Sequence, residues 1–203
     1  TLEFLVWTND TTRATALVRQ DGILVKSGDT TRRYVGSFYT TGTTTTADTL
    51  TSRYLCNYYN RVVRPVKRFE TTDSWVYTTA TWREANASTN NRINFISGVA
   101  EDSIFLNLIG VYSNSAVHFA MVALGYDSTS VPSSIYGSGA SQQANLSNYV
   151  TSSYSGIMTV GKHFVSWLEI STAAGTTTWY GDINPASGVP AIIQSGIMGI
   201  IRG

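Results

Sequence analysis

The sequence predicts an all-β fold, an antiparallel β-sandwich of the jelly-roll type with little helix, formed by residues 1–203 as a single domain. Three observations support this prediction. Short segments rich in β-branched and aromatic residues are separated by Gly, Asn, Asp and Ser along most of the chain. Runs with a helical period are scarce. Charged residues make up only 13% of the chain, so hydroxyl groups carry much of its polarity. Two packed sheets accommodate many short antiparallel strands.

The first strands are predicted within residues 1–40. TLEFLVW at the start reads as a strand already under way, which indicates a piece of a longer protein. ATALVR and ILVKS flank Gln20-Asp21-Gly22, and Asp-Gly between apolar runs is a strong hairpin signal. Ser27-Gly28-Asp29 then turns the chain into RRYVGSFYTT, which completes a three-stranded meander. The hydroxyl-rich TTGTTTTADT that follows is expected to form a loop or a frayed strand.

One segment, residues 47–60, carries a helical pattern. Leu50, Tyr54 and Tyr58 fall four residues apart after Asp48, a residue type that caps helices. We therefore expect at most one or two short helical pieces in the chain. The first choice lies between Asp48 and Tyr59.

The remaining strands are predicted from short apolar and aromatic runs. They are SWVYTTATW (74–82), NRINFISGVA (91–100), SIFLNLIGVYS (103–113), SAVHFAMVALGY (115–126), KHFVSWLEIS (162–171), TTTWYGD (176–182) and AIIQSGIMGIIRG (191–203). The last run alternates and is uncharged until Arg202, which predicts a central strand near a core or a subunit interface. YGSGAS (136–141) has the glycines of a phosphate loop without its lysine, and we interpret it as a surface loop.

The basic and aromatic segment RYLCNYYNRVVRPVKRF (53–69) has two interpretations. Aromatic rings beside Lys and Arg suit a platform for single-stranded nucleic acid. Pro65 gives no ladder donor, and basic residues protect sheet edges, so the segment also suits an edge strand. In that strand Val62, Arg64, Val66 and Arg68 line one face, and Val63, Pro65, Lys67 and Phe69 line the other. The net charge of +1 is low for a nucleic-acid binder. We favour the edge strand and expect no nucleic-acid partner.

The charges are unevenly distributed along the chain. Residues 13–68 carry a net charge of +7, and residues 69–203 carry −4. Such polarity suggests complementary contacts, either between subunits or with a larger anionic surface. Between subunits, each basic region would meet the acidic region of a neighbour. We predict a homotrimer. The candidate subunit or virion contacts are Arg32, Arg33, Arg61, Arg64, Lys67 and Arg68.

No catalytic or metal-binding constellation is recognisable in the sequence, and no cofactor is expected. His118 and His163 lie in apolar, strand-like runs and are predicted to be hydrogen-bonded sheet histidines. Glu101-Asp102 could be half of a glycosidase pair with Glu84, Asp127 or Glu169, but a solvated turn is the preferred interpretation. The lone Cys56 can form no internal disulfide. Because no catalytic constellation is recognisable, we do not expect an enzyme. No apolar window approaches the length of a membrane helix, so we expect no membrane insertion.

Carbohydrate binding is the alternative function, through a lectin-like sandwich module. Five Trp and 12 Tyr offer many rings for stacking on sugars. Trp75, Trp167 and Trp179 lie in strand-like runs and are expected in the core. Trp82 lies near a loop and is the candidate for glycan stacking.

Several strings in the chain resemble a largely uncharacterised family of tailed-bacteriophage virion proteins. The strings are WTNDTTRATAL, QDGILVKSGDTTRRYVGSFYTT, RYLCNYYNRV, TDSWVYTTATWREAN and SGIMGIIRG. The resemblance runs from about residue 5 to the C-terminus and is closest up to Asn86. Cys56 stands where the family has an aromatic residue. These motifs carry no known chemistry, so no catalytic or binding residue is transferred from the family.

The resemblance implies a non-enzymatic structural protein located in the virion. It would be exposed on the particle surface as a fibre, spike or capsid decoration and would contribute to host attachment. Other virion proteins and a host-surface glycan are the partners that this role implies. Members of the family have further sequence ahead of the WTN segment, so the chain is expected to be the C-terminal part of a longer protein.

Overall fold

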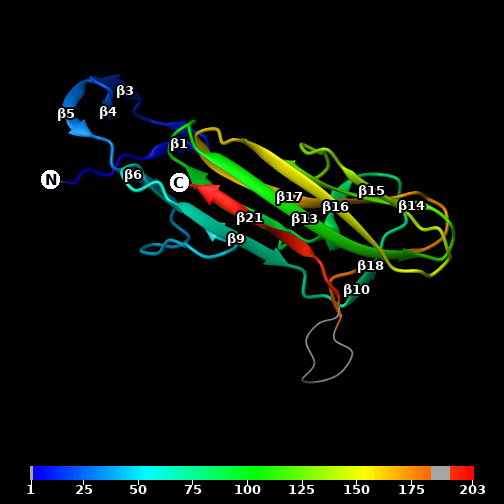
Figure 1. Cartoon of the computed structure of the whole chain (residues 1–203). Helices are drawn as coiled ribbons and strands as arrows, with labels where there is room; N and C mark the ends of the chain where they lie inside the picture. The colour runs from blue at the N-terminus through cyan, green and yellow to red at the C-terminus, as the bar shows by residue number, and fades with distance from the viewer. Residues whose placement is uncertain (1, 184–192) are drawn as a thin grey trace.

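The computed structural model describes residues 2–183 and 193–203, and nearly all of their regular structure is β (Figure 1). No α-helix occurs in these residues; a single 3-10 turn, η1 (Ala85–Ala87), is the only helical element. Two six-stranded sheets pack face to face, which confirms the prediction of an all-β sandwich.

The first sheet is organised around its longest strand, β13. β16 pairs with one edge of β13, while β21 and β18 pair with successive parts of the other edge. β9 and β10 extend the sheet beyond β21 and β18, and all of these pairings are antiparallel. The strands of this sheet are β9 (Val63–Phe69), β10 (Ser74–Val76), β13 (Ser103–Asn114), β16 (Asn148–Ile157), β18 (Thr177–Tyr180) and β21 (Gly196–Arg202).

The second sheet is organised around β17, which pairs with β14 on one edge and with β12 and β11 on the other. β15 extends the sheet beyond β14, and the short β7 pairs in parallel with β12. The strands of this sheet are β7 (Ser52–Arg53), β11 (Arg83–Glu84), β12 (Arg92–Ser97), β14 (Phe119–Tyr126), β15 (Gly137–Ala140) and β17 (Gly161–Ser171).

The core lies between the two sheets and is built by alternate residues of their strands. Trp75, Trp167 and Trp179 are all buried in it, as predicted. The rings of Trp75 and Trp167 meet edge to face with centroids 5.7 Å apart, a geometry that aromatic quadrupoles favour. Full burial of a large apolar side chain contributes about 1.5–3 kcal/mol. These rings therefore account for a large part of the cohesion between the sheets.

The N-terminal third forms smaller sheets beside the sandwich. Asp21 and Gly22 both have positive φ, 51° and 81°, as a two-residue hairpin turn of type I′ requires. The predicted meander forms, but its third strand ends at Arg33, and the rest of the predicted third strand lies in a separate small sheet. The meander projects from the end of the sandwich where the C-terminus lies (Figure 1). The small sheets are β1 (Trp7–Asn9) with β2 (Thr12–Arg13); β3 (Leu17–Gln20), β4 (Ile23–Lys26) and β5 (Asp29–Arg33); β6 (Gly36–Phe38) with β8 (Leu55–Asn57); and β19 (Asp182–Ile183) with β20 (Ile193–Gln194).

Two predictions near the N-terminus are wrong. The helix expected between Asp48 and Tyr59 does not form, because this segment contains β7 and β8. Tyr54 and Cys56 are buried while Leu55 is exposed, so the effective period is two and sheet pairing overrides the four-residue spacing. The strand expected over residues 1–7 begins only at Trp7.

The interpretation of YGSGAS as a surface loop is also wrong, since its centre forms β15. A Cβ atom at Gly137 would overlap the Thr151 carbonyl oxygen, and one at Gly139 would lie 2.7 Å from a Val150 methyl carbon. The glycines are therefore needed because β16 approaches β15 closely at this edge of the sandwich. The prediction also missed β16 itself.

The prediction for residues 62–69 is confirmed, and the C-terminal run contains the expected central strand. That run is not one strand, however, because it is broken at Ser195 and β20 pairs with β19 in a separate small sheet. β9 is an edge strand that contains Pro65, and Val66 is buried while Val63 and Pro65 are exposed. β21 is a central strand between β13 and β9. The first two residues of the predicted strand, 191 and 192, lie outside the described residues.

Candidate functional site

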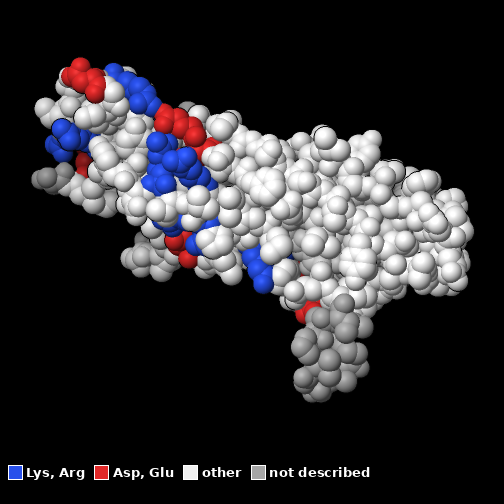
Figure 2. All heavy atoms as spheres, in the orientation of Figure 1, with Lys and Arg blue, Asp and Glu red and all other residues white. Residues whose placement is uncertain are grey.

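The six predicted basic contact residues lie on β5, on β9 and in the segment that leads into β9. Charged side chains gather toward the end of the molecule where β5 lies, whereas most of the rest of the visible surface is uncharged (Figure 2). Several of the six form ion pairs within the chain. Arg61 lies 3.1 Å from Glu101 and 3.3 Å from Asp102, and Arg64 lies 2.5 Å from Asp48. Part of the predicted pairing between basic and acidic regions therefore occurs inside one subunit.

The other members of the set differ in their surroundings. Arg32 lies 3.4 Å from Asp29 in the same strand. Lys67 places its ammonium group 3.9 Å from the centroid of the Phe69 ring, a cation–π contact. Arg33 and Arg68 make no ion pair with any described residue. Their role as subunit or virion contacts stays a prediction.

Trp82, the candidate for glycan stacking, lies between β10 and β11 and is half-buried. The centroid of its ring is 5.9 Å from that of Tyr136, which is 55% exposed. The fold thus brings together two aromatic side chains that are 54 residues apart in the sequence. Nothing in the local pattern around either residue indicates this pairing.

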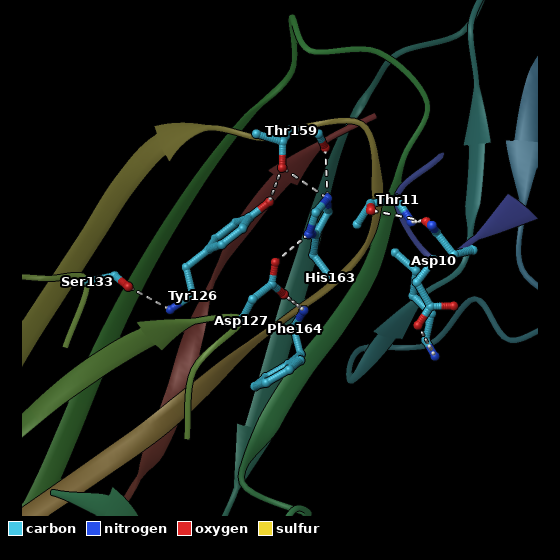
Figure 3. Close-up of polar contacts among 10 residues, drawn as sticks. Asp10, Thr11, Tyr126, Asp127, Ser133, Thr159, His163 and Phe164 are labelled. Carbon is cyan, nitrogen blue, oxygen red and sulfur yellow. Dashed lines mark hydrogen bonds and ion pairs between the residues drawn. The ribbon is translucent and has the colours of Figure 1, made fainter. Parts of the chain in front are cut away.

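A polar cluster that the sequence did not predict surrounds His163, near the start of β17 (Figure 3). The Nδ1 atom of the ring lies 2.6 Å from a carboxylate oxygen of Asp127, whose other oxygen accepts the Phe164 amide at 3.0 Å. The Nε2 atom lies 3.2 Å from the Thr159 hydroxyl and 3.0 Å from the Thr159 carbonyl oxygen. The prediction of a hydrogen-bonded sheet histidine is confirmed for His163, whereas His118 immediately precedes β14.

The cluster borders a cavity of about 390 Å³ between the β1–β2 hairpin and the second sheet. Its lining consists of Asp10, Thr11, Tyr54, Arg92, Asn94, Asp127, Lys162, His163 and Phe164. The charged groups of this lining are largely paired: Arg92 binds Glu84, and Lys162 lies 3.4 Å from Asp10.

The order of Thr159, His163 and Asp127 resembles a hydroxyl–imidazole–carboxylate triad. However, His163 is only 3% exposed, and its Nε2 atom also faces a main-chain carbonyl oxygen that has no proton to exchange. The contacts tie the segments after β14 and before β17 to the sheet. The arrangement is therefore suited to holding two chain segments together.

Two further carboxylates are buried near the second sheet. Glu169 is 0% exposed and accepts hydrogen bonds from the indole N–H of Trp75 at 2.8 Å and the Arg83 guanidinium at 2.9 Å. Burial raises the pKa of Glu169 to about 7, opposed by these donors. Glu70 accepts the amide N–H groups of Thr71 and Thr72, and hydrogen bonds hold its pKa below the usual value against the effect of burial.

The carboxylates considered for a glycosidase pair engage separate partners. Glu84 binds Arg92, while Glu101 binds Arg19 and Arg61. The preferred interpretation of a solvated turn holds for Glu101. It is wrong for Asp102, which is buried and whose pKa is raised by burial.

A broad apolar surface lies on the side of the first sheet that faces away from the core. We call this surface, formed by the outward residues of β9, β13, β16 and β21, the outer face. The strand register places its side chains in rows, with Phe105 between Ser155 and Ile200, and Ile200 opposite Pro65. Phe105 is 45% exposed and Ile200 is 43% exposed. The other exposed apolar side chains of the outer face are Val63, Ile109, Tyr149, Ile157 and Met198.

The two sheets differ in how their sides away from the core are covered. The chain itself covers part of this side of the second sheet, whereas the exposed side chains of the outer face have no such cover from the described residues. Ala123 and Leu168 point away from the core and are nevertheless fully buried. The segment after β14 crosses this side, where the Ser166 hydroxyl donates a hydrogen bond to the Ser128 carbonyl oxygen at 2.5 Å. An antiparallel sheet normally presents polar residues to water on its uncovered side. On β16 the outer face keeps this pattern with Thr151, Ser153 and Ser155. On β9, β13 and β21 it departs from the pattern through the exposed apolar side chains named above, which indicates an interaction surface.

No group of three or more His, Cys, Asp or Glu side chains within the described residues could hold a metal ion, and none of their helical segments could span a membrane. No protein-family model and no curated protein matches the sequence. Among solved structures, the chain is similar to a Paenibacillus sp. cycloisomaltooligosaccharide glucanotransferase complexed with cycloisomaltoheptaose, with 14% identity and a TM-score of 0.27. The match covers 61% of this chain and 18% of that enzyme, a likeness too low to carry an argument about function.

Proposed function

We propose that the chain is a non-enzymatic structural protein of a tailed-phage virion, exposed on the particle surface as a fibre, spike or capsid decoration. The observation that carries the proposal is the outer face, because an apolar sheet surface of this extent suits a subunit that is covered in an assembly. The resemblance of the N-terminal strings to virion proteins supports the same conclusion.

The scarcity of charge supports an assembly role. Asp127 is the only Asp, Glu, Lys or Arg between residues 103 and 161, a stretch that includes β13, β14, β15 and β16. Interface centres are depleted in charged residues, since desolvating an unpaired charge is costly. A homotrimer with other virion proteins as partners is the assembly we expect. Its basic contacts would be the members of the set that lack a carboxylate inside the chain, Arg33, Lys67 and Arg68.

The proposal is tested on purified particles of a phage that encodes the chain. The protein should remain with the particles through a density gradient in a constant copy number, and gold-labelled antibodies should bind intact particles. Recovery of the protein only in the soluble fraction of the lysate would refute a virion role. Turnover of a host polysaccharide by the purified chain would refute its non-enzymatic character.

A second candidate, the binding of a host glycan, is favoured by the pair formed by Trp82 and Tyr136. Half-exposed aromatic rings offer apolar faces on which a neutral sugar ring can stack. An aromatic contact contributes about 0.5–1.5 kcal/mol, so Trp82→Ala should weaken glycan binding by up to about tenfold. Tyr149→Ala, which removes an exposed ring from the other sheet, should leave binding unchanged. Equal affinities for all three chains on immobilised host glycans would exclude this site.

A further inference from the structure

We infer that the outer face is buried against the same face of a second copy of the chain, related to it by a two-fold axis. This inference rests on the surface that carries the proposed function, but it concerns the purified chain and needs no phage. It names the partner of that surface. Three properties of the outer face lead to it: its size, its lack of acidic residues, and the Asn107 side chain near its middle.

The size of the outer face is sufficient for a specific contact. Strands lie about 4.8 Å apart and rise about 3.4 Å per residue, so four strands of about eight residues cover roughly 500 Å² in projection. The accessible area is larger because the side chains stand up from the sheet. A standard interface takes about 800 Å² from each partner, whereas most crystal contacts take less than about 400 Å². The outer face is therefore larger than most crystal contacts and approaches the area of a stable interface.

The outer face carries few charges. None of its outward positions carries an acidic residue. Lys67 is held over the Phe69 ring, and Arg202 lies at the end of β21 beside the rim. A matching surface should itself combine apolar and hydroxyl side chains and carry few charges. The chain supplies such a surface in its own outer face, and two sheets pack well face to face.

Asn107 supplies the argument for identical partners. It points outward from the middle of β13, half-buried, between Ser153 on β16 and Met198 on β21. Its side chain makes no hydrogen bond to any described residue. An amide carries both donors and an acceptor, so the same residue from a second copy can satisfy it across a two-fold axis. A polar residue within an apolar interface also selects one register over others.

The test compares Phe105→Glu with a matched control, Phe119→Glu. Both phenylalanines lie in strands and are about half exposed, but Phe119 belongs to β14 in the second sheet. At tens of micromolar, light scattering should give a wild-type mass that Phe105→Glu halves and that Phe119→Glu leaves unchanged. The mass should halve in either case: a dimer held by the two-fold contact alone becomes a monomer, and two trimers joined by it become single trimers. Circular dichroism confirms that each variant keeps the β-sheet spectrum of the wild type.

A charge-swap experiment shows whether the face meets itself. Chains with Phe105→Glu and chains with Phe105→Lys should each have the halved mass, and an equimolar mixture should regain the wild-type mass. Any of three results overturns the inference. The first is a wild-type mass equal to that of Phe105→Glu, and the second is a halved mass for both Phe105→Glu and Phe119→Glu. The third is a mixture of the Phe105→Glu and Phe105→Lys chains that keeps the halved mass. If the chain belongs to particles but does not pair in solution, only this inference fails. If it pairs but is absent from particles, only the proposed function fails.

Discussion

The buried carboxylate Glu169 allows a quantitative test of how the core responds to pH. Burial raises its pKa from 4.5 to about 7 in the folded chain. Because the folded state then holds the proton more tightly than the unfolded state, the contribution of Glu169 to stability is complete below pH 4.5. It is lost progressively as the pH rises through about 7. At 1.36 kcal/mol for each pKa unit, the loss above pH 8 amounts to about 3 kcal/mol.

The assay is urea unfolding of the wild type and Glu169→Gln at pH 5 and pH 8.5, followed by tryptophan fluorescence. Glutamine stays neutral at every pH, while the other titratable groups, including Glu70 and Asp102, are common to both chains. Part of the loss has already occurred at pH 5, so the wild type should lose about 2.5 kcal/mol more than the variant between the two pH values. The variant should also be less stable at pH 5. Its NH2 group replaces one of the two oxygens and therefore faces either the Trp75 indole N–H or the Arg83 N–H, a donor–donor conflict that costs about 1–3 kcal/mol.

An equal pH dependence of the two chains would refute this reasoning. It would mean that the guanidinium and the N–H donors around Glu169 compensate fully for burial, so that the carboxylate is ionised in the folded chain throughout the range. A steeper pH dependence in the variant would refute it as well.

Two further predictions concern the segments that the fold holds in place. Asp127→Ala removes the acceptor of two hydrogen bonds and should lower the free energy of unfolding by about 1–3 kcal/mol in urea titrations. The control Asp10→Ala removes an exposed ion pair and should lower it by less than about 1 kcal/mol. Similar losses for the two variants would show that the Asp127 hydrogen bonds are dispensable. Gly137→Ala places a methyl group against the Thr151 carbonyl oxygen and should lower the thermal midpoint by several degrees, while Gly203→Ala, in open space, should not. An unchanged midpoint for Gly137→Ala would show that β15 does not need this close approach.

Local features of the fold could be predicted because their causes are local. Asp21-Gly22 forms the expected hairpin turn, since few residues other than Gly, Asn and Asp tolerate positive φ at both positions. Pro65 lies on an edge strand because it has no backbone N–H to donate, and an edge strand has one side that needs no ladder hydrogen bonds. The aromatic strand residues Trp75, Trp167 and Trp179 are in the core, as their apolar surroundings indicated.

Pairings over long sequence distances could not be predicted. Glu169 meets Trp75, 94 residues away, and His163 meets Asp127, 36 residues away. The glycines of β15 signal a close approach, but the partner that approaches, β16, is known only from the fold. The helical spacing in residues 47–60 was overridden because pairing in a sheet satisfied the backbone and buried Tyr54 and Cys56 together.

The candidate interface shows most clearly what each level determines. The alternation in SIFLNLIGVYS and SGIMGIIRG determined that these segments are strands with side chains on two faces. Both faces are apolar, however, and alternation alone does not say which face a second sheet will cover. The tertiary structure decided that Leu106 and Ile197 face the core and that Phe105 and Ile200 face outward. The physical reason is that burial is a property of the space between elements, which depends on strands brought together from distant parts of the chain.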